Sequence, residues 1–370
     1  MDYPDKIELA QLQTALIRAN RPFVSYRLPG HTNPVTMFGA DRYQEFKSID
    51  EALNQKKGFV LAPFAEGEPI LWLKAVNISE GISVDPSFLN GLPVRNFPFV
   101  NPVVSHIGKD QYKQKVQQAL DYIWKGTAGK IVISRQLLQK WPNAFQKIGS
   151  LFKNLCDAYP NTFVYVAYIP GAGIWAGASP DTLLKSEKGL ISTMSLSGTR
   201  KIQTENSDWG QKEIDEHLWV SRFIAESLGN SGCSELQISP MNTVQAGAVE
   251  HLRTDYLATC DIGLIPRLVN TLHPTPAVCG WPTPVARQLI SEIENYDRSY
   301  YTGYLGPVDD ATTFNFFVNL RCMNVTGNHA VIYAGGGITS GSDPESEWVE
   351  TELKSQTMLG AIENLANFAD

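Results

Sequence analysis

Two pairs of glutamates with a spacing of three residues are the first groups in the sequence that could do chemistry. Glu213 and Glu216 lie in the segment KEIDEH, and Glu347 and Glu350 lie near the C-terminus. Residues three apart share one face of a helix. Two helices that each present such a pair could converge on one hard cation, and carboxylate oxygens suit Mg²⁺ better than zinc. The same spacing is typical of solvated helix faces, and the spacing alone favours that interpretation.

The C-terminal pair belongs to a segment, YAGGGITSGSDPESEWVETELK, that predicts a strand, a glycine turn, a loop and then a helix. Asp343 is a suitable N-cap and Pro344 a suitable first helical residue. Lys354 follows Glu350 by one helical turn, so the two side chains can form an ion pair.

Three consecutive glycines in this segment, Gly335, Gly336 and Gly337, match neither the dinucleotide-binding nor the P-loop pattern. Because glycine lets a ligand approach the backbone closely, their N–H groups could still bind a carboxylate. Arg321 ends the apolar segment NFFVNLR, where an arginine is either a surface cap or a bidentate carboxylate clamp.

Two further residues could transfer protons. Lys130 opens the apolar strand KIVISR; such a lysine usually lies in water, but an enclosed one could act as a general base. Asp181, in SPDTLL, sits where a helix could begin. Its carboxylate could simply interact with the positive end of the helix dipole.

The composition is that of an ordinary globular protein. The formal net charge of −7, without runs of Lys or Arg, argues against nucleic acid or an anionic membrane as a partner. No apolar run approaches the ~20 residues of a membrane span. The five cysteines are scattered and form no CxxC pair, which predicts unpaired thiols and a cytoplasmic location.

The predicted elements favour an α+β fold with a mainly antiparallel sheet, because strands come in consecutive runs rather than in alternation with helices. Helices are expected over residues 7–19, after a cap at Asp110, and over residues 142–158, 212–228 and 285–294. No low-complexity linker divides the chain. We therefore expect residues 1–105, which carry no site signature, to pack closely against a catalytic region of residues 106–370.

The order of these segments resembles one family, the chorismate-utilising enzymes, which include isochorismate synthase, salicylate synthase, aminodeoxychorismate synthase and the anthranilate synthase large subunit. The matching motifs are KIVISR, GASPDTLL, SLSGTRK, KEIDEHLW, HLRTD, LHPTPAVCGWP, YDRSYYTGYLG, NLRC, YAGGGI and SEWVETELK. They run in order from Lys130 to the C-terminus. The resemblance implies a large sandwich of antiparallel sheets flanked by helices, with the active site in the cleft between them.

The resemblance also implies roles for individual residues. Carboxylates matching Glu216 and Glu350 bind Mg²⁺, and those matching Glu213 and Glu347 form an outer shell through water. The ion holds the ring carboxylate of chorismate, while Arg321 and the amides of the three glycines hold its enolpyruvyl carboxylate. Gly198, Thr199, His251 and Lys354 match further positions around substrate or metal. Many members of the family are monomers, and this chain shows no coiled-coil heptads.

Two positions imply which reaction the chain performs. Members that add water have a lysine matching Lys130, and ammonia users and salicylate synthases have threonine where this chain has Ala277. Both features imply an isochorismate synthase, in which Lys130 activates water for attack at C2 and an acid protonates the leaving C4 hydroxyl. That acid is usually glutamate, whereas this chain has the shorter Asp181.

Two alternatives remain open on the sequence. A salicylate synthase would also eliminate pyruvate, and Ala277 speaks against it. A weakened paralogue that binds chorismate without efficient turnover is favoured by Asp181 and disfavoured by Lys130, Glu216 and Glu350. Whether menaquinone, siderophore or salicylate synthesis uses the product is not encoded in these motifs.

Overall fold

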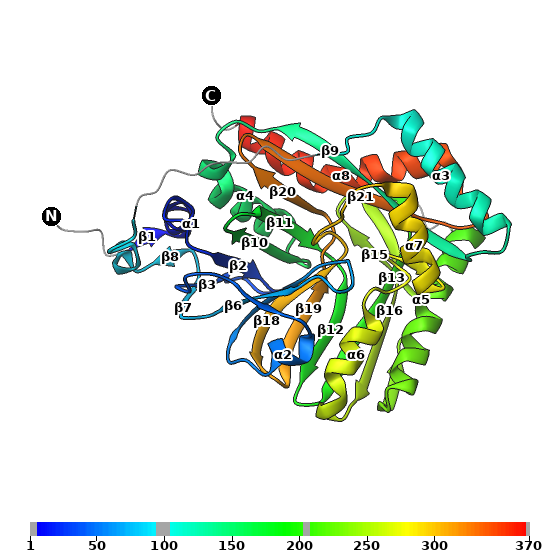
Figure 1. Ribbon diagram of the computed structural model, residues 1–370, viewed down its shortest axis with the longest axis horizontal. Coiled ribbons are helices and arrows are strands. Elements are labelled where there is room, and N and C mark those ends of the chain that lie inside the picture. The colour runs from blue at the N-terminus through cyan, green and yellow to red at the C-terminus, as the bar shows by residue number, and fades with distance from the viewer. Residues whose placement is uncertain (1–5, 94–103, 203–207, 368–370) are drawn as a thin grey trace.

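The computed structural model describes residues 6–93, 104–202 and 208–367. These residues form two large antiparallel β-sheets that face each other, with helices on both outer surfaces (Figure 1). The predicted α+β class and the sandwich of antiparallel sheets are therefore confirmed.

The first sheet has nine strands. Their spatial order is β17 (Gly280–Trp281), β9 (Lys130–Lys140), β21 (His329–Ile338), β20 (Cys322–Thr326), β11 (Gly173–Ser179), β10 (Phe163–Ile169), β2 (Phe23–Arg27), β3 (Val35–Phe38) and β7 (Asn77–Glu80).

The second sheet has ten strands. It runs β14 (Ser234–Ile238), β16 (Val249–Thr259), β13 (Leu190–Lys201), β12 (Thr182–Glu187), β19 (Thr313–Val318), β18 (Tyr304–Asp310), β5 (Gly58–Ala62), β6 (Ile70–Lys74) and β4 (Gln44–Phe46), with β15 (Asn242–Ala246) also paired to β16. A short ladder joins β1 (Ile7–Glu8) to β8 (Ser83–Val84).

Helices cover the outer face of each sheet. Those packed against the nine-stranded sheet are α1 (Leu9–Arg18), α3 (Lys109–Trp124), α4 (Ala144–Ala158), α7 (Thr283–Glu294) and α8 (Pro344–Asn367). Those packed against the ten-stranded sheet are α2 (Ile49–Leu53), α5 (Gln211–Asn230) and α6 (Ile265–Leu272). None of the described helices has the length and hydropathy to span a bilayer.

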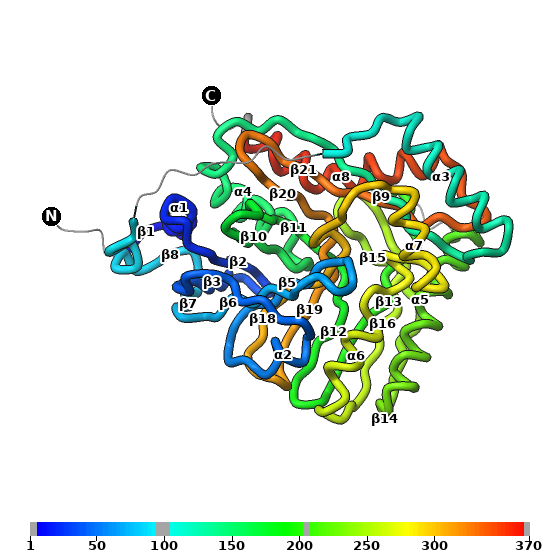
Figure 2. The backbone as a smooth tube through the Cα atoms, in the orientation of Figure 1, coloured from blue at the N-terminus to red at the C-terminus, as the bar shows by residue number. Residues whose placement is uncertain are grey.

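Aromatic side chains form the core between the two sheets. Phe163 of β10 stacks on Phe317 of β19 with ring centroids 4.1 Å apart. Phe59 of β5 packs against Tyr26 of β2 in the same cluster. Strands from the first hundred residues therefore belong to both sheets, and the backbone trace in Figure 2 shows how they extend the sheets begun by later segments.

Two chain crossings between the sheets lie side by side. β11 and β12 are consecutive but belong to different sheets, and so do β19 and β20. The backbone N–H of Val318 donates to the carbonyl of Asp181 (3.0 Å), and that of Ala178 donates to the carbonyl of Arg321 (3.1 Å). These hydrogen bonds place Asp181 and Arg321 together at the junction of the two sheets.

Most predicted helices and strands are confirmed, with four local corrections. The segment around Asp181 was expected to begin a helix, but it joins two strands. Arg321 does not end one long strand; it follows β19 at a turn, with a backbone φ of +48°, before β20 starts in the other sheet. The three glycines lie within strand β21 rather than in a turn. Gly108, not Asp110, caps α3, and Asp110 lies in its first turn.

Candidate active site

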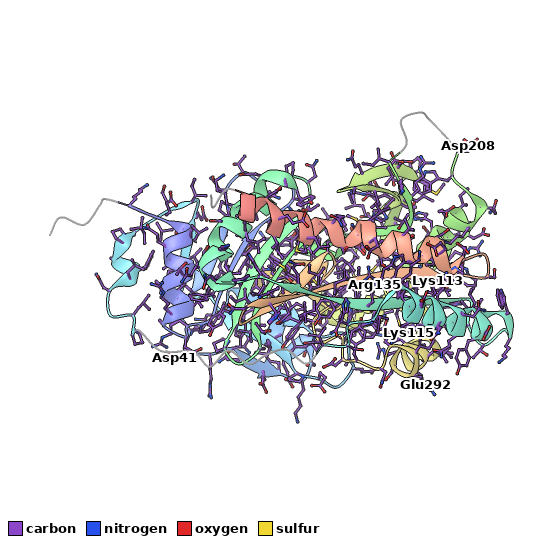
Figure 3. The ribbon with its side chains drawn as sticks, turned by 90° about the horizontal axis from the view of Figure 1, so that it is seen from above. Asp41, Lys113, Lys115, Arg135, Asp208 and Glu292 are labelled. Atoms are coloured by element: carbon purple, nitrogen blue, oxygen red, sulfur yellow. The ribbon has the colours of Figure 1, made fainter. Side chains whose placement is uncertain are left out.

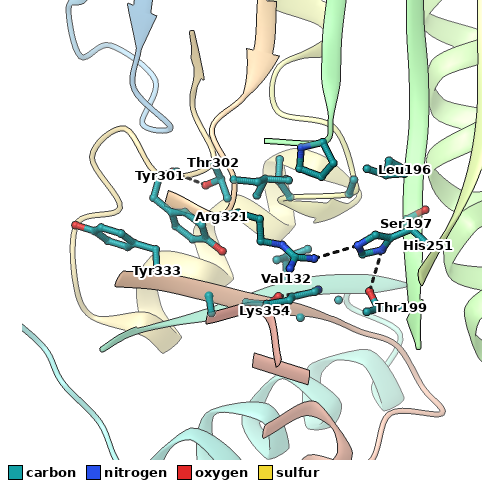
Figure 4. A pocket seen from close by; sticks show the side chains of 18 of the residues that line it. Val132, Leu196, Ser197, Thr199, His251, Tyr301, Thr302, Arg321, Tyr333 and Lys354 are labelled. Atoms are coloured by element: carbon teal, nitrogen blue, oxygen red, sulfur yellow. Dashed lines mark hydrogen bonds between the residues drawn. The ribbon is translucent and has the colours of Figure 1, made fainter. Parts of the chain in front are cut away.

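A pocket lies next to the two crossings and is lined by residues of both sheets. About 650 Å³ inside it is free of atoms, part of it open to solvent. Figure 4 shows side chains from both sheets and from α8 converging on it. The lining includes Val132, Pro180, Leu196, Ser197, Thr199, Glu216, His251, Ala277, Val278, Tyr301, Thr302, Leu320, Arg321, Tyr333, Ala334, Gly335, Gly336, Gly337 and Lys354. Most residues singled out in the sequence therefore meet at one place.

The three glycines of β21 form the floor on which the acidic groups rest. A Cβ atom added to Gly337 would come within 2.3 Å of Glu216 Oε1, and one added to Gly336 within 2.6 Å of Glu347 Oε2 and 3.4 Å of Glu350 Oε1. A side chain at either position would therefore push these carboxylates out of their present places. Three of the four predicted acidic residues thus converge from α5 and α8 on one short stretch of backbone.

Among the described strands, one pairs with this glycine stretch. Gly335–Gly337 pair with β9, whereas the registered pairs of β21 with β20 end at Ile332. At the other edge the carbonyl of Gly335 accepts a hydrogen bond from Lys354 Nζ (3.0 Å). Backbone groups at this edge therefore face the pocket, in a strand rather than the turn that the glycines predicted.

Each converging carboxylate has a lysine partner. The three ion pairs are Lys130–Glu216 (2.9 Å), Lys212–Glu347 (2.7 Å) and Lys354–Glu350 (2.5 Å). The predicted pair of Glu350 and Lys354 along one helix face is confirmed, and so is Asp343 as the cap of α8, which accepts from Ser346 N (2.9 Å).

The pKa values of two of these carboxylates shift in opposite directions, although burial alone would raise both. Burial would raise the pKa of Glu216, but the ammonium of Lys130 outweighs it, and the pKa is lowered. Burial and the adjacent Glu350 raise the pKa of Glu347, although Lys212 opposes this. Glu347 is 1 % exposed, and its Oε2 has no hydrogen-bond partner among the residues that the structure describes. A buried carboxylate oxygen without a partner favours a cation.

These residues suit a hard divalent ion in the type of donor they offer. In the described part of the chain no three acidic, histidine or cysteine side chains are already arranged around one point as metal ligands. The lysine ammonium groups lie where they neutralise the carboxylates instead. Glu213, the fourth predicted acid, turns back over Gly210, with Oε2 2.5 Å from the position of a Cβ there.

Opposite the acidic groups, Arg321 and His251 form a hydrogen-bonded pair. His251 Nδ1 lies 2.9 Å from the carbonyl oxygen of Gly198 and must donate to it, because a carbonyl only accepts. Its Nε2 therefore accepts from Arg321 Nη2 (3.1 Å). Thr199 Oγ1 lies 3.3 Å from Nδ1 as well (Figure 4). The histidine is neutral, and burial together with Arg321 and Lys354 holds its pKa well below its ordinary value.

The other terminal nitrogen of the Arg321 guanidinium, Nη1, takes no part in the hydrogen bond to His251. Within the described part of the chain this nitrogen is buried without a hydrogen-bond partner. Burial lowers the pKa of Arg321 to about 10, so the group remains charged at neutral pH. A charged donor at a pocket wall with no protein acceptor is typical of a carboxylate- or phosphate-binding position.

Lys130 and Asp181 lie just behind the pocket wall. Lys130 has no exposed surface, so it is enclosed rather than at a solvated strand end. Its neighbours Glu216 and Gly337 line the pocket. Asp181 is 3 % exposed and follows the lining residue Pro180. Burial raises the pKa of Asp181 to about 7, opposed by Arg253, so its carboxyl holds a proton near neutrality more readily than an ordinary aspartate.

A buried ion pair fixes the wall that carries Ala277. Arg298 donates to both carboxylate oxygens of Glu294 and to the carbonyls of Val278 (2.9 Å) and Val132 (2.8 Å). Glu294 also accepts from the backbone N–H of Ser134 in β9 (2.6 Å). One pair of charges therefore ties β9, α7 and the loop after Ala277 together.

Sequence reasoning missed several pocket residues. Tyr301 and Tyr333 stack with ring centroids 5.1 Å apart along one wall of the pocket. Both belong to motifs quoted above, but the sequence alone assigned no role to either. Lys212 and Arg298 also lay inside quoted motifs without a role. The spacing of Lys212, one turn before Glu216, was the available signal for its position beside the acidic groups.

Comparison with known proteins agrees with this arrangement. A family model described as "Chorismate binding enzyme" matches residues 96–363. The isochorismate synthase DhbC of Bacillus subtilis is 30% identical over 272 residues, which are 68% of this chain and 68% of that protein. The isochorismate synthase MenF of the same organism is 30% identical over 268 residues, which are 69% of this chain but 56% of that longer protein.

Solved structures show the same fold at lower identity. The menaquinone-specific isochorismate synthase MenF of Escherichia coli superposes with a TM-score of 0.77 at 21% identity, covering 96% of this chain and 93% of that one. Anthranilate synthase component I of Streptococcus pneumoniae gives a TM-score of 0.66 at 18% identity, covering 91% and 89%. With the family model matched over most of its length, the chain belongs to the family of chorismate-binding enzymes.

Proposed function

We propose that this protein is an isochorismate synthase, which isomerises chorismate by adding water at C2 and releasing the C4 hydroxyl. The observation that carries the proposal is the fully enclosed Lys130 beside a pocket that also holds an unpaired arginine donor. Relatives from several species that bear the name isochorismate synthase support it.

The pocket suits a substrate with two carboxylates. The free Nη1 of Arg321 and the open edge of the glycine strand would bind the enolpyruvyl carboxylate. His251 keeps the guanidinium in place by accepting from its other nitrogen. Gly198 and Thr199 in turn fix the histidine, so these residues position Arg321.

Glu216 and Glu350 would hold Mg²⁺ directly, and Glu347 and Glu213 would contact the ion through water molecules. When bound, the ion would neutralise the acidic groups and polarise the ring carboxylate of the substrate. Lys354 lies beside this position, held by Glu350 and the carbonyl of Gly335. Its ammonium adds positive charge for a dianionic substrate on an otherwise acidic protein.

Two proton transfers complete the proposed reaction. Lys130, in its neutral amine form, accepts a proton from the water whose oxygen attacks C2, and the ring double bonds shift as the C4–O bond breaks. Asp181 donates a proton to the departing oxygen, which leaves as water. The product is an isomer of the substrate, because one water enters and one leaves. Ala277 leaves room at the pocket wall where a threonine would add a hydroxyl.

The role of Asp181 as the acid predicts that turnover falls at high pH, which gives the pH–rate profile a descending limb. Since its carboxyl must be protonated and its pKa is raised to about 7, we expect turnover with saturating Mg²⁺ to fall tenfold per pH unit above about pH 7. The same raised pKa means that the contribution of this group to folding stability is complete below the unfolded pKa of ~3.9 and decreases as pH rises toward 7. Turnover measured from pH 5.5 to 9 tests the limb.

Variants at this position provide the control. Asp181→Asn should lower the rate by roughly 10²–10⁴-fold and abolish the limb. Asp181→Glu restores the acid with a longer side chain; a rise in rate would indicate that the pocket accepts the longer acid, and a collapse that the backbone is fitted to aspartate. An unchanged limb in Asp181→Asn would show that another group donates the proton.

Product analysis separates the proposed reaction from its alternatives. Purified protein incubated with chorismate and Mg²⁺ should accumulate isochorismate without pyruvate, and added ammonium should give no aminated product. Stoichiometric pyruvate would identify a salicylate synthase. Chorismate binding without turnover would identify a weakened paralogue. Parallel reactions with a chelator test the dependence on Mg²⁺.

The setting of the enzyme follows from the same comparison. The matched proteins include synthases named as 2,3-dihydroxybenzoate-specific, vibriobactin-specific, menaquinone-specific and for salicylate biosynthesis, so the pathway that uses the product stays open between menaquinone, siderophore and salicylate synthesis. All five cysteines are free thiols, which supports a cytoplasmic enzyme. We propose that it acts as a monomer, which gel filtration with light scattering would test.

A further inference from the structure

Three lysine side chains neutralise the three converging carboxylates, but they differ in their freedom to move. Lys130 is fully buried. Lys354 donates to the carbonyl of Gly335 as well as to Glu350. The Lys212 side chain is 25 % exposed, and Glu347 is the one hydrogen-bond acceptor recorded for its ammonium among the described residues. Of the three, Lys212 can exchange its partner for water with the least rearrangement.

The partner of Lys212 is the carboxylate that most needs a cation. Glu347 is almost completely buried, and no described residue forms a hydrogen bond with its Oε2, while Oε1 accepts from Lys212 and from Ser342 Oγ (2.7 Å). Glu350 lies close by, since both carboxylates approach the same point above Gly336. Without a positive charge here, two buried carboxylates would repel each other.

Lys212 stays charged in this position. Burial would lower its pKa, but Glu347 and Glu350 outweigh this effect and raise it. Its ammonium also lies on the helix face of α5 that presents Glu216, one turn away, and Glu216 adds to the same field. A divalent ion held by Glu216 and Glu350 would therefore meet the positive charge of the Lys212 ammonium, which it would have to displace.

We propose that Lys212 is an internal competitor for the metal: its ammonium holds Glu347 in the metal-free protein and moves to solvent when a divalent ion binds. The inference rests on the proposed function, because it requires that the glutamates hold such an ion. Lys212 then has two opposing effects. It stabilises the empty acidic cluster by bridging α5 and α8, and it weakens metal binding.

The test replaces the ammonium by an apolar group of similar length, Lys212→Met. We expect its affinity for Mn²⁺, followed by electron paramagnetic resonance, and for Mg²⁺, followed by calorimetry, to rise on the order of 10-fold. The metal-free variant should melt at a lower temperature than the parent protein. Adding Mg²⁺ should raise its melting temperature by more than it raises that of the parent.

Two variants control for net charge and for side-chain loss. Lys113→Met removes one positive charge from α3 (Lys113 is labelled in Figure 3), where Lys113 contacts the exposed Glu345 and neither residue belongs to the pocket lining; its metal affinity should equal that of the parent. Lys212→Arg retains the cation, and its affinity should remain within about twofold of the parent value.

The outcomes separate this inference from the proposed function. Unchanged or weaker metal binding by Lys212→Met, or an equal gain in Lys113→Met, overturns the competitor role while leaving the metal site intact. Failure of the parent and all variants to bind Mn²⁺ or Mg²⁺ overturns the metal assignment itself, and the competitor role with it.

Discussion

Replacing Lys130 by alanine should reduce isochorismate formation by about 10²–10⁴-fold, the contribution typical of one positioned general base. The amine is completely enclosed, and Glu216 Oε1 holds it 2.9 Å away beside the pocket. No water can replace its basicity at the same place. The measurement is the rate of product formation at saturating chorismate and Mg²⁺.

The loss of activity in Lys130→Ala must be distinguished from a loss caused by misfolding, because this truncation leaves Glu216 buried without its nearest cation. Lys130→Gln fills most of the space and keeps a donor toward Glu216, yet it cannot accept the proton, so it should be nearly as inactive. Lys140→Ala, at the exposed far end of the same strand, should retain full activity. Near-full hydration activity in Lys130→Gln would refute the assignment of Lys130 as the base.

Breaking the buried pair of Arg298 and Glu294 should cost about 3–5 kcal/mol of folding stability. Both side chains are almost completely buried, at 2 % and 0 % exposure, so either one left alone would be an uncompensated charge in the interior. Arg298→Met should therefore lower the free energy of unfolding measured by urea denaturation at pH 7. Because Arg298 also donates to the carbonyls of Val132 and Val278, its replacement should loosen the pocket wall that these residues form as well.

A surface ion pair gives the matched comparison. Arg253→Met breaks a contact with Asp255 in which both side chains are more than one third exposed, and it should cost less than about 1 kcal/mol. The double replacement Arg298→Met with Glu294→Gln should recover part of the loss, since it removes the unpaired charge. Equal destabilisation by Arg298→Met and Arg253→Met would contradict the role of burial.

Local sequence patterns determined most of the secondary structure. The apolar alternation and runs that predicted β2, β5, β10 and β21 needed no tertiary information, because each strand buries side chains in one of two adjacent layers. The cap at Asp343 and the pairing of Glu350 with Lys354 are likewise contacts within one helix. Short elements such as α2 and β15 lack a long enough pattern and were missed.

The ordered motifs also determined the family and the candidate residues, although spacing alone favoured solvated glutamates. What no local pattern could decide is which residues meet. Glu216 reaches Lys130 only because α5 packs against the ten-stranded sheet while β9 belongs to the other. Arg321 and Asp181 were misplaced because their neighbours look like one strand and one helix start. A chain crossing between sheets has no local hydrophobic period of its own.

The sequence by itself therefore determined the chemical groups, and the tertiary structure decided their state. Whether Lys130 is solvated or enclosed, and whether Asp181 holds a proton near neutrality, depends on residues far away along the chain that exclude water. Charge and pKa respond to the surrounding dielectric and to partners in space, and neither is fixed by neighbours along the chain.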